Sequence, residues 1–157
     1  MLLTRRITGF SLIELIACIV IIGILAAVIG PKFFDNTPFS QRGYVDEVAS
    51  AIRYANSVAV GSGCDVSITL TSTSYQALQR AKSGNTCAAT GGWSTTVKWS
   101  DGSGNVAGAA PSNVTLSPAM QIVFNAQGNV IGGASPVLNI GTHTISVDAV
   151  SGLVTVQ

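Results

Sequence analysis

A run of twenty mostly apolar residues, Phe10 to Ile29, carries a single charged side chain, the carboxylate of Glu14. As an α-helix this run spans about 30 Å, which matches the hydrocarbon core of a bilayer. A carboxylate inside such a segment costs about 2.5–3.5 kcal/mol on membrane-insertion scales and usually has a partner. The run therefore predicts a helix suited to apolar surroundings, with Glu14 as a candidate functional residue.

The residues around this run bear on how it is processed. The pair Arg5-Arg6 precedes it, so the positive-inside rule places this end in the cytoplasm and the rest of the chain in the opposite compartment. Three alternatives follow: a signal peptide cut near 26–27, an uncleaved single-pass anchor, or cleavage between Gly9 and Phe10 that leaves the apolar segment on the mature chain. A carboxylate has no use in the apolar region of a signal peptide, which argues against the first.

The segment from Gly9 to Leu15, GFSLIEL, resembles the class III leader of type IV pilins and type II secretion pseudopilins. The resemblance implies that a membrane-embedded prepilin peptidase cuts after Gly9 and methylates the new amino terminus at Phe10. Residues 1–9 would then be a removed leader. Residues 10–30 would form a transmembrane helix that later packs in a filament core, and residues 31–157 a periplasmic pilin-like domain.

Glu14 lies four residues after Phe10, so both fall on one face of a helix and could pair within one subunit. The resemblance implies that Glu14 is the assembly residue, which neutralises the terminal amine of a neighbouring subunit. An unpaired charge in an apolar filament core is costly, so this pairing would favour one stagger between subunits. The alternative is that Glu14 only faces lipid headgroups near the start of the helix.

The same resemblance implies the partners and the location of the chain. The subunit would cross the bacterial inner membrane once, with its N-terminus in the cytoplasm and its globular domain in the periplasm. It would meet the lipid bilayer, the prepilin peptidase, an inner-membrane assembly platform and other pilin or pseudopilin subunits. It would then enter a periplasmic pseudopilus or a surface pilus.

A second helix is predicted to begin at Thr37-Pro38, a pair typical of a helix N-terminus. It should extend to about residue 60, where Gly61-Ser62-Gly63 ends it. Its buried face is read from positions at helical spacing: Val45, Val48, Ala49, Ile52, Ala55, Asn56 and Ala59. With a helix break expected at Gly30-Pro31, the chain would have one long interrupted helix, half transmembrane and half amphipathic.

Beyond Cys64 the apolar pattern changes to a period of two, which predicts strands. Residues 126–129 and 151–152 read as hairpin turns, and the glycine-rich segment 100–113 as a loop. The fold class is therefore α+β, a long N-terminal helix packed on antiparallel sheet. The expected strands cover residues 66–70, 75–80, 95–99, 115–116, 121–124, 130–131, 137–140, 142–147 and 153–156.

The three cysteines divide into one apolar and two polar positions. Cys18, within the apolar run, is interpreted as a small buried hydrophobe. Cys64 and Cys87 lie in the domain on the oxidising side, where either a disulfide or two free thiols would fit. A bridge would close a loop of about 24 residues and contribute about 3–4 kcal/mol. Two tryptophans, Trp93 and Trp99, are expected to pack beside it.

The domain also resembles minor pseudopilins of the H class, and minor subunits of mannose-sensitive haemagglutinin-type pili, through Ile122 to Val130 and the closing strand after Ser151-Gly152. Major type IVa pilins usually place their disulfide near the C-terminus, whereas here seventy residues follow Cys87. This departure favours a minor subunit. The alternatives are a major pilin or a DNA-binding minor pilin for DNA uptake.

Other functions find weak support. Charged residues make up 10% of the chain and the formal net charge is +1, which argues against nucleic acid as a partner. Asp101, Ser103 and Asn105 are spaced like the start of a calcium loop but lack the later bidentate glutamate, so a flexible polar loop is the better interpretation of residues 101–105. His143 is the single histidine, so neither a zinc site nor a hydrolase triad is expected. We expect no enzymatic activity, cofactor or metal.

Mass spectrometry of the N-terminal peptide separates the three processing alternatives. We expect the membrane and sheared-fibre fractions to yield a chain that starts at Phe10 and carries one methyl group on its amine. A chain that starts at Met1 would indicate an uncleaved anchor. A start near Ala27 would indicate a signal peptide, and either result would overturn the prepilin interpretation.

Overall fold

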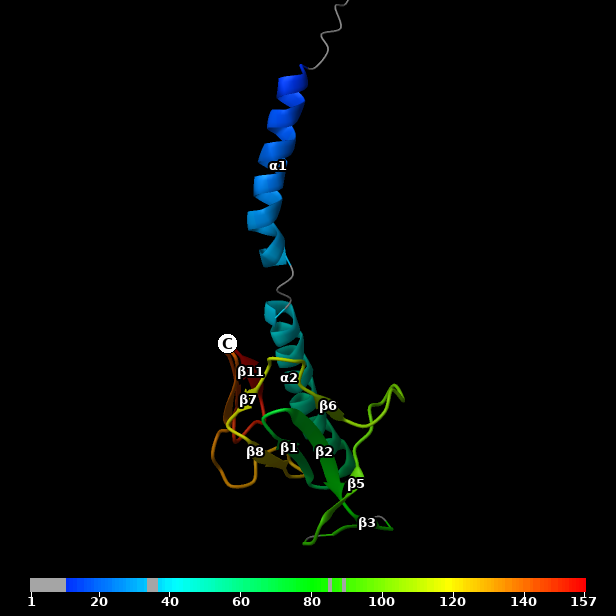
Figure 1. The fold of residues 1–157 in the computed structure, drawn as a ribbon. Helices are drawn as coiled ribbons and strands as arrows, with labels where there is room; N and C mark the ends of the chain where they lie inside the picture. Colours follow the sequence, from blue (N-terminus) through cyan, green and yellow to red (C-terminus); the bar gives the residue numbers. More distant parts are fainter. Residues whose placement is uncertain (1–10, 34–36, 85, 89) are drawn as a thin grey trace, which may run out of the picture. The chain divides into compact units, whose positions relative to one another are not determined.

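The computed structural model describes residues 11–33, 37–84, 86–88 and 90–157. By the density of their internal contacts the residues form two compact units, one up to Asn36 and one from Thr37 to Gln157. Gly9, Phe10 and the leader 1–9 lie outside the described residues. Figure 1 shows one helix, α1, in the first unit and a second helix with all the strands in the other. This is the α+β class that the sequence predicts.

The first helix, α1, extends from Leu12 to Phe33. It continues through Gly30-Pro31, so the prediction of a break at that pair is wrong. Proline lacks one backbone donor and its ring crowds the preceding turn, which disfavours a helix interior. Here only two helical residues follow Pro31, so its effect falls on the last turn.

The second helix, α2, extends from Thr37 to Ser62 and carries the buried face that the sequence predicts. Each of the predicted apolar positions is fully or almost fully buried, and Asn56 is half-buried. Tyr44 and Ala51 join them on the same face. The helix ends before Gly63, whose φ of 66° lies in the left-handed region that glycine adopts without strain.

The larger sheet is antiparallel and has the strand order β5-β2-β1-β8. The strand β6 also pairs with β2, at residues 74–76, whereas β5 pairs with residues 78–80 of β2. Its centre is the hairpin β1–β2, in which Ile68 lies opposite Ala77. On the other side of β1, Ile68 lies opposite Ile122. The strands are β1 (Val66–Leu70), β2 (Ser74–Arg80), β5 (Trp93–Thr96), β6 (Ala107–Ala109) and β8 (Met120–Phe124).

The second sheet has the order β11-β10-β9-β7 and is also antiparallel. Its inner face alternates with a polar outer face, as in β9 and β10, where Leu138, Ile140, Ile145 and Val147 are buried. A separate two-stranded hairpin, β3–β4, follows β2. The bounds are β3 (Lys82–Ser83), β4 (Thr86–Cys87), β7 (Leu116–Ser117), β9 (Val137–Ile140), β10 (His143–Val147) and β11 (Val154–Val156).

One core joins α2 to both sheets. It contains Ile52 from the helix, Ile68 and Phe124 from the larger sheet, and Ile140 and Ile145 from the second, all with no more than 1% of their surface exposed. Burial of each such side chain stabilises the fold by about 1.5–3 kcal/mol. Among the residues whose burial the structure describes, the buried hydrophobic ones all lie in the Thr37–Gln157 unit.

One loop prediction and two strand predictions need correction. The segment 100–113 is not simply a loop, because Val106 is fully buried and β6 pairs with β2. The strand expected at 95–99 starts and ends earlier, as β5. Residues 130–131 form only an isolated bridge between Phe124 and Val130 after the turn predicted there. Short or glycine-rich strands carry little periodic signal of their own, so their pairing depends on a neighbouring edge.

Two turns close against α2 through a side-chain amide. Asn56 Nδ2 donates to the carbonyl oxygen of Gly128 at 2.7 Å. Gly152 has a φ of 67°, and a Cβ built there would collide with the amide of Asn56 and with the Gly128 carbonyl oxygen. Only glycine therefore lets the 125–129 and 148–153 turns meet at the helix.

We expect Gly152→Ala to lower the free energy of unfolding by about 2–4 kcal/mol, because left-handed strain and overpacking add. Gly102→Ala is the matched control: its φ is 79°, but a Cβ there meets nothing within 4 Å. That variant should lose only about 1–2 kcal/mol from the backbone strain. Urea unfolding of the two chains, followed by circular dichroism, measures the difference; equal losses would show that the Asn56 contact does not matter.

Candidate functional site: the apolar helix and its carboxylate

The predicted assembly residue lies in the first turn of α1. The backbone N–H groups of Glu14 and Leu15 donate to the Ser11 carbonyl oxygen at 3.1 and 3.2 Å. The Glu14 side chain is exposed, and no hydrogen bond or ion pair joins it to another residue in the described part of the chain. Its predicted partner, the amine of Phe10, lies outside that part, so the role of Glu14 in assembly stays a prediction.

From Leu12 to Ala26, the apolar side chains of α1 are exposed on every side of the helix. Among the large ones, the exposed fraction ranges from 44% at Ile16 to 76% at Leu12. A helix that is apolar all round is stable only when lipid or protein covers it. Cys18 is on this surface too, as a free and exposed thiol rather than a buried one.

Within the described residues, no helix combines the length and the apolar character that crossing a membrane requires.

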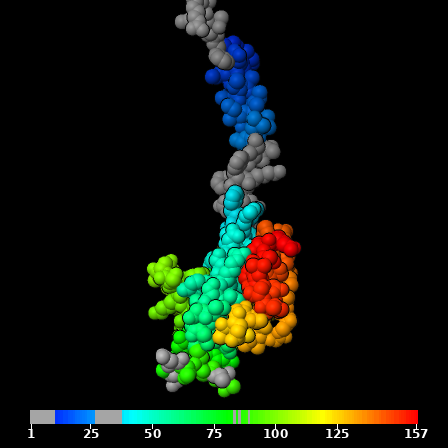
Figure 2. Space-filling model, turned by 180° about the vertical axis from the view of Figure 1, so that it is seen from behind, coloured from blue at the N-terminus to red at the C-terminus, as the bar shows by residue number. Residues whose placement is uncertain are grey.

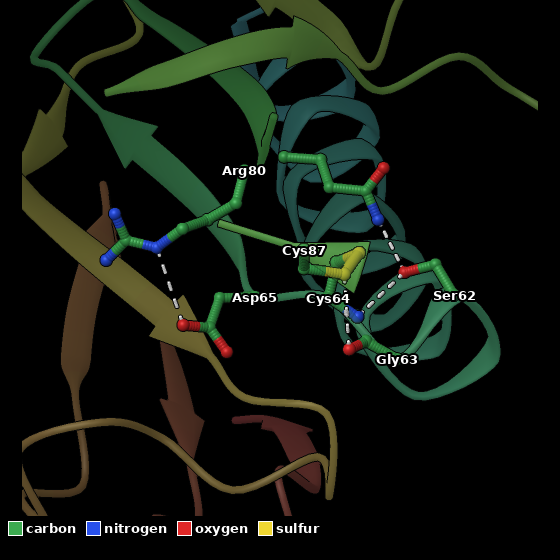
Figure 3. The surroundings of a disulfide bond; sticks show 7 residues. Ser62, Gly63, Cys64, Asp65, Arg80 and Cys87 are labelled. Atoms are coloured by element: carbon green, nitrogen blue, oxygen red, sulfur yellow. Dashed lines mark hydrogen bonds and ion pairs between the residues drawn. A yellow bond between two sulfur atoms is a disulfide. The ribbon is translucent and has the colours of Figure 1, made fainter. Parts of the chain in front are cut away.

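A disulfide joins Cys64, just beyond α2, to Cys87 in β4. Their Cα atoms are 5.5 Å apart, within the usual range for a bridge. Figure 3 shows the bond beside the end of α2, where the Cys64 N–H donates to Ser62 Oγ at 3.3 Å. Ser62 Oγ also accepts a hydrogen bond from Gln79 of β2. The bridge thus fixes the β3–β4 hairpin to the helix terminus and the larger sheet.

Each tryptophan has a defined packing partner in the globular unit. Trp99 packs on Tyr54 of α2, with ring centroids 4.8 Å apart, and the Tyr54 hydroxyl donates to the Lys98 carbonyl oxygen at 2.9 Å. Trp93 lies under the guanidinium of Arg80, whose Cζ is 4.4 Å from the ring centroid. Their packing beside the disulfide stays a prediction.

The Arg80 side chain contacts three other residues: Asp65, Gly91 and Trp93. Its Nε lies 3.5 Å from Asp65 Oδ2, and its Nη1 donates to the Gly91 carbonyl oxygen at 2.5 Å (Figure 3 shows the ion pair). Together with the stacked Trp93 these contacts hold the chain after β4 against β2. The sequence pattern offers no sign of this arrangement, because the partners are far apart in the chain.

A pair of buried tyrosines forms a second feature that the sequence pattern did not reveal. Tyr44 and Tyr75 have ring centroids 6.3 Å apart, and the Tyr75 hydroxyl donates to Glu47 Oε1 at 2.7 Å. Burial, then the hydrogen bond to Glu47, raise the pKa of Tyr75 well above its usual range. Gly108 of β6 lies against the same groups, since a Cβ there would collide with Glu47 Oε1. The cluster therefore sets how closely β6 approaches α2.

The remaining candidate residues are not grouped into a metal site in the part of the chain that the structure describes. Asp101 Oδ1 accepts a hydrogen bond from the Ser103 N–H at 2.9 Å, and the hydrogen bonds from Ser103 hold the pKa of Asp101 below its usual value. His143 is half-buried at the start of β10. In the described part of the chain, no three His, Cys, Asp or Glu side chains are grouped so as to hold a metal ion.

Two family models match the chain. Residues 4–30 match the prokaryotic N-terminal methylation motif, and residues 45–156 match the type II transport protein GspH. The second match covers most of the chain, from the first turns of α2 to the last strand. The chain belongs to the GspH family.

A curated relative of this GspH-family chain is the type IV narrow pilus major component PilA5 of Thermus thermophilus, 48% identical over 54 residues. The match covers 34% of this chain and spans about half of the relative, 47% of its length.

Two kinds of solved structure share the fold of this GspH-family chain. Two crystal structures of the type IV minor pilin FimU of Pseudomonas aeruginosa align with TM-scores of 0.51 and 0.55, at 14% and 12% identity. They cover 74% and 78% of this chain and 91% of FimU. The minor pseudopilin EpsH from the Type 2 Secretion System of Vibrio cholerae aligns with a TM-score of 0.52 at 16% identity, over 78% of this chain and 97% of EpsH.

These findings confirm the pilin or pseudopilin class and its α+β fold. The chain is a structural subunit of this class, and the family is in general not enzymatic.

Removal of the disulfide tests its contribution. We expect Cys64→Ser with Cys87→Ser to lower the free energy of unfolding by about 3–4 kcal/mol, because the unfolded chain regains the freedom of the closed loop. Cys18→Ser is the matched control, since it also replaces a thiol but leaves the bridge intact. Urea unfolding under non-reducing conditions measures both; a loss of less than 1 kcal/mol in the double variant would contradict the loop-closure account.

Proposed function

We propose that the chain is a minor subunit of a type IV pilus or of a type II secretion pseudopilus. It is made as a prepilin, cut by the prepilin peptidase after Gly9 and methylated on Phe10. The segment 10–30 then holds it in the inner membrane, with the globular unit in the periplasm. The assembly platform later moves it into a filament through α1.

The observation that carries this proposal is the chemistry of α1. Its apolar side chains from Leu12 to Ala26 are exposed all round, while the carboxylate of Glu14 stands unpaired in the first turn among the described residues. Such a surface fits lipid before assembly and neighbouring subunits afterwards. Glu14, the single charged residue of the run Phe10 to Ile29, supplies a polar contact that could set the stagger between them. The match to the methylation motif over 4–30 supports the processing step.

The minor role is supported by the globular unit. It matches the GspH model, and the titles of the FimU and EpsH structures that share its fold name minor subunits. The position of Cys87, far before the C-terminus, points the same way. The relative named as a major component matches only 54 residues, so a major pilin remains the alternative.

A DNA-uptake pilin is less well supported by the contacts of its basic residues. In the globular unit, Arg53 donates to the Val154 carbonyl oxygen at 3.1 Å, and Arg80 is paired with Asp65. Beyond Lys98 the chain contains neither lysine nor arginine. A stripe of unpaired cations, which phosphate binding requires, is therefore not formed by these residues.

We expect Glu14→Ala to be cleaved and membrane-held as usual but to enter fibres at least about tenfold less than the wild type. An amine left unpaired in apolar surroundings costs about 3–5 kcal/mol. The measurement is the ratio of the chain in sheared fibres to that in membranes, with the N-terminal peptide read by mass spectrometry.

The matched control is Asp46→Ala, which removes one exposed carboxylate from α2 and should leave the ratio unchanged. Wild-type incorporation of Glu14→Ala would refute the assembly role. An equal loss in both variants would assign the effect to net charge instead.

A further inference from the structure

A shallow hollow lies where the start of α2 meets the start of β10. Its volume is about 280 Å³, and the described residues that line it are Pro38, Phe39, Arg42 and His143. Phe39 is 83% exposed, more than any other large apolar side chain of the described chain. Figure 2 shows the first turns of α2 (cyan) at one end of the globular unit, with the C-terminal strands beside them.

The walls of this hollow are held by a contact between the two elements. Gln41 Nε2 donates to the Ile140 carbonyl oxygen at 2.9 Å, which fixes the helix to the turn between β9 and β10. Gly141 occupies that turn with a φ of 59°, and a Cβ there would collide with the Gln41 amide. Arg42 and His143 therefore lie beside a junction that a hydrogen bond and close packing hold in place.

Among the described residues, no carboxylate forms an ion pair with Arg42, the cation of the hollow. Arg42 is exposed and makes no hydrogen bond or ion pair with any other residue that the structure describes. The side chain of His143 likewise has no hydrogen-bond partner there. The described lining contains no acidic residue. An exposed aromatic ring beside an unpaired guanidinium suits a surface that is apolar on one side and anionic on the other.

The position of the hollow in the chain indicates which surface this is. Seven residues, 31–37, separate Pro38 from the end of the segment 10–30, and seven residues reach at most about 25 Å when fully extended. The headgroup region adjoins the hydrocarbon core on each side of a bilayer. The tether therefore keeps the hollow within reach of the headgroups wherever the segment 10–30 is embedded.

We propose that Phe39, Arg42 and His143 form a docking site for the phosphate headgroups of the leaflet from which the globular unit emerges. The guanidinium of Arg42 binds phosphate, and the ring of Phe39 enters the interface. This proposal rests on the membrane-held stage of the proposed function. The contact is made before assembly and is given up when the subunit enters a filament.

The test uses the full chain with Phe39→Trp, reconstituted in phosphatidylcholine vesicles with or without phosphatidylglycerol. Quenching by lipids that carry a nitroxide on the headgroup reports contact of residue 39, after subtraction of the signal of the unsubstituted chain, which contains Trp93 and Trp99. We expect strong quenching that increases with phosphatidylglycerol. Adding Arg42→Gln should weaken the contact about fivefold, the effect of removing one basic side chain from an anionic surface.

The matched control is Lys98→Gln in the same Phe39→Trp chain. It removes one positive charge from an exposed position outside the hollow and should leave the quenching unchanged. Equal losses from Arg42→Gln and Lys98→Gln would overturn the site in favour of a general charge effect. Quenching that does not depend on phosphatidylglycerol would overturn the role of Arg42.

Extraction with alkaline carbonate separates this proposal from the proposed function. A chain that resists extraction while residue 39 stays unquenched would overturn the docking site alone. A chain that is released by carbonate would overturn both the docking site and the membrane-held stage. Protection of residue 39 only in assembled fibres would assign the hollow to a neighbouring subunit and overturn the lipid site.

Discussion

Close packing of the small residues on α2 against two sheets is the constraint on which the globular unit depends. Ala49, Ala51, Ala55 and Ala59 are completely buried. Since alanine side chains are short, strands of both sheets can approach the helix backbone, while Ile52 and Val48 fill the space between them. A larger side chain at any of these alanines would separate the sheets from their common support. The orientation of the two turns at Asn56, and of the junction at Gln41, follows from this packing.

The two helices differ in whether their apolar side chains are buried within the subunit. α2 buries its apolar stripe within the subunit, whereas the apolar side chains of α1 from Leu12 to Ala26 are exposed on all sides. The buried core that the structure describes lies within the Thr37–Gln157 unit, and the α1 side chains from Leu12 to Ala26 take no part in it. The globular unit therefore has a hydrophobic core of its own.

Polar contacts secure the parts of the globular unit that contain little apolar surface. The disulfide and the Ser62 contacts hold the β3–β4 hairpin, and Arg80 holds the chain that follows it. The Asp148 carboxylate accepts hydrogen bonds from the backbone N–H groups of Val150 and Ser151 and from the Ser151 hydroxyl, which lowers the pKa of this carboxyl group and shapes the last turn. Short-range polar bonds of this kind order glycine-rich and serine-rich segments that cannot contribute to a core.

The sequence by itself determined the features that repeat or cluster locally. The apolar run with Glu14, the buried stripe of α2 and the alternation in β1, β9 and β10 depend on periods of a few residues, so each could be predicted without the fold. Tertiary structure alone decided the order of the strands, the pairing of β6 with β2 and the partners of Trp93 and Trp99. It also decided the Tyr44–Tyr75–Glu47 cluster and the meeting of Arg42 with His143. These features join residues far apart in the chain, and their energies depend on which surfaces the core brings together rather than on any local pattern.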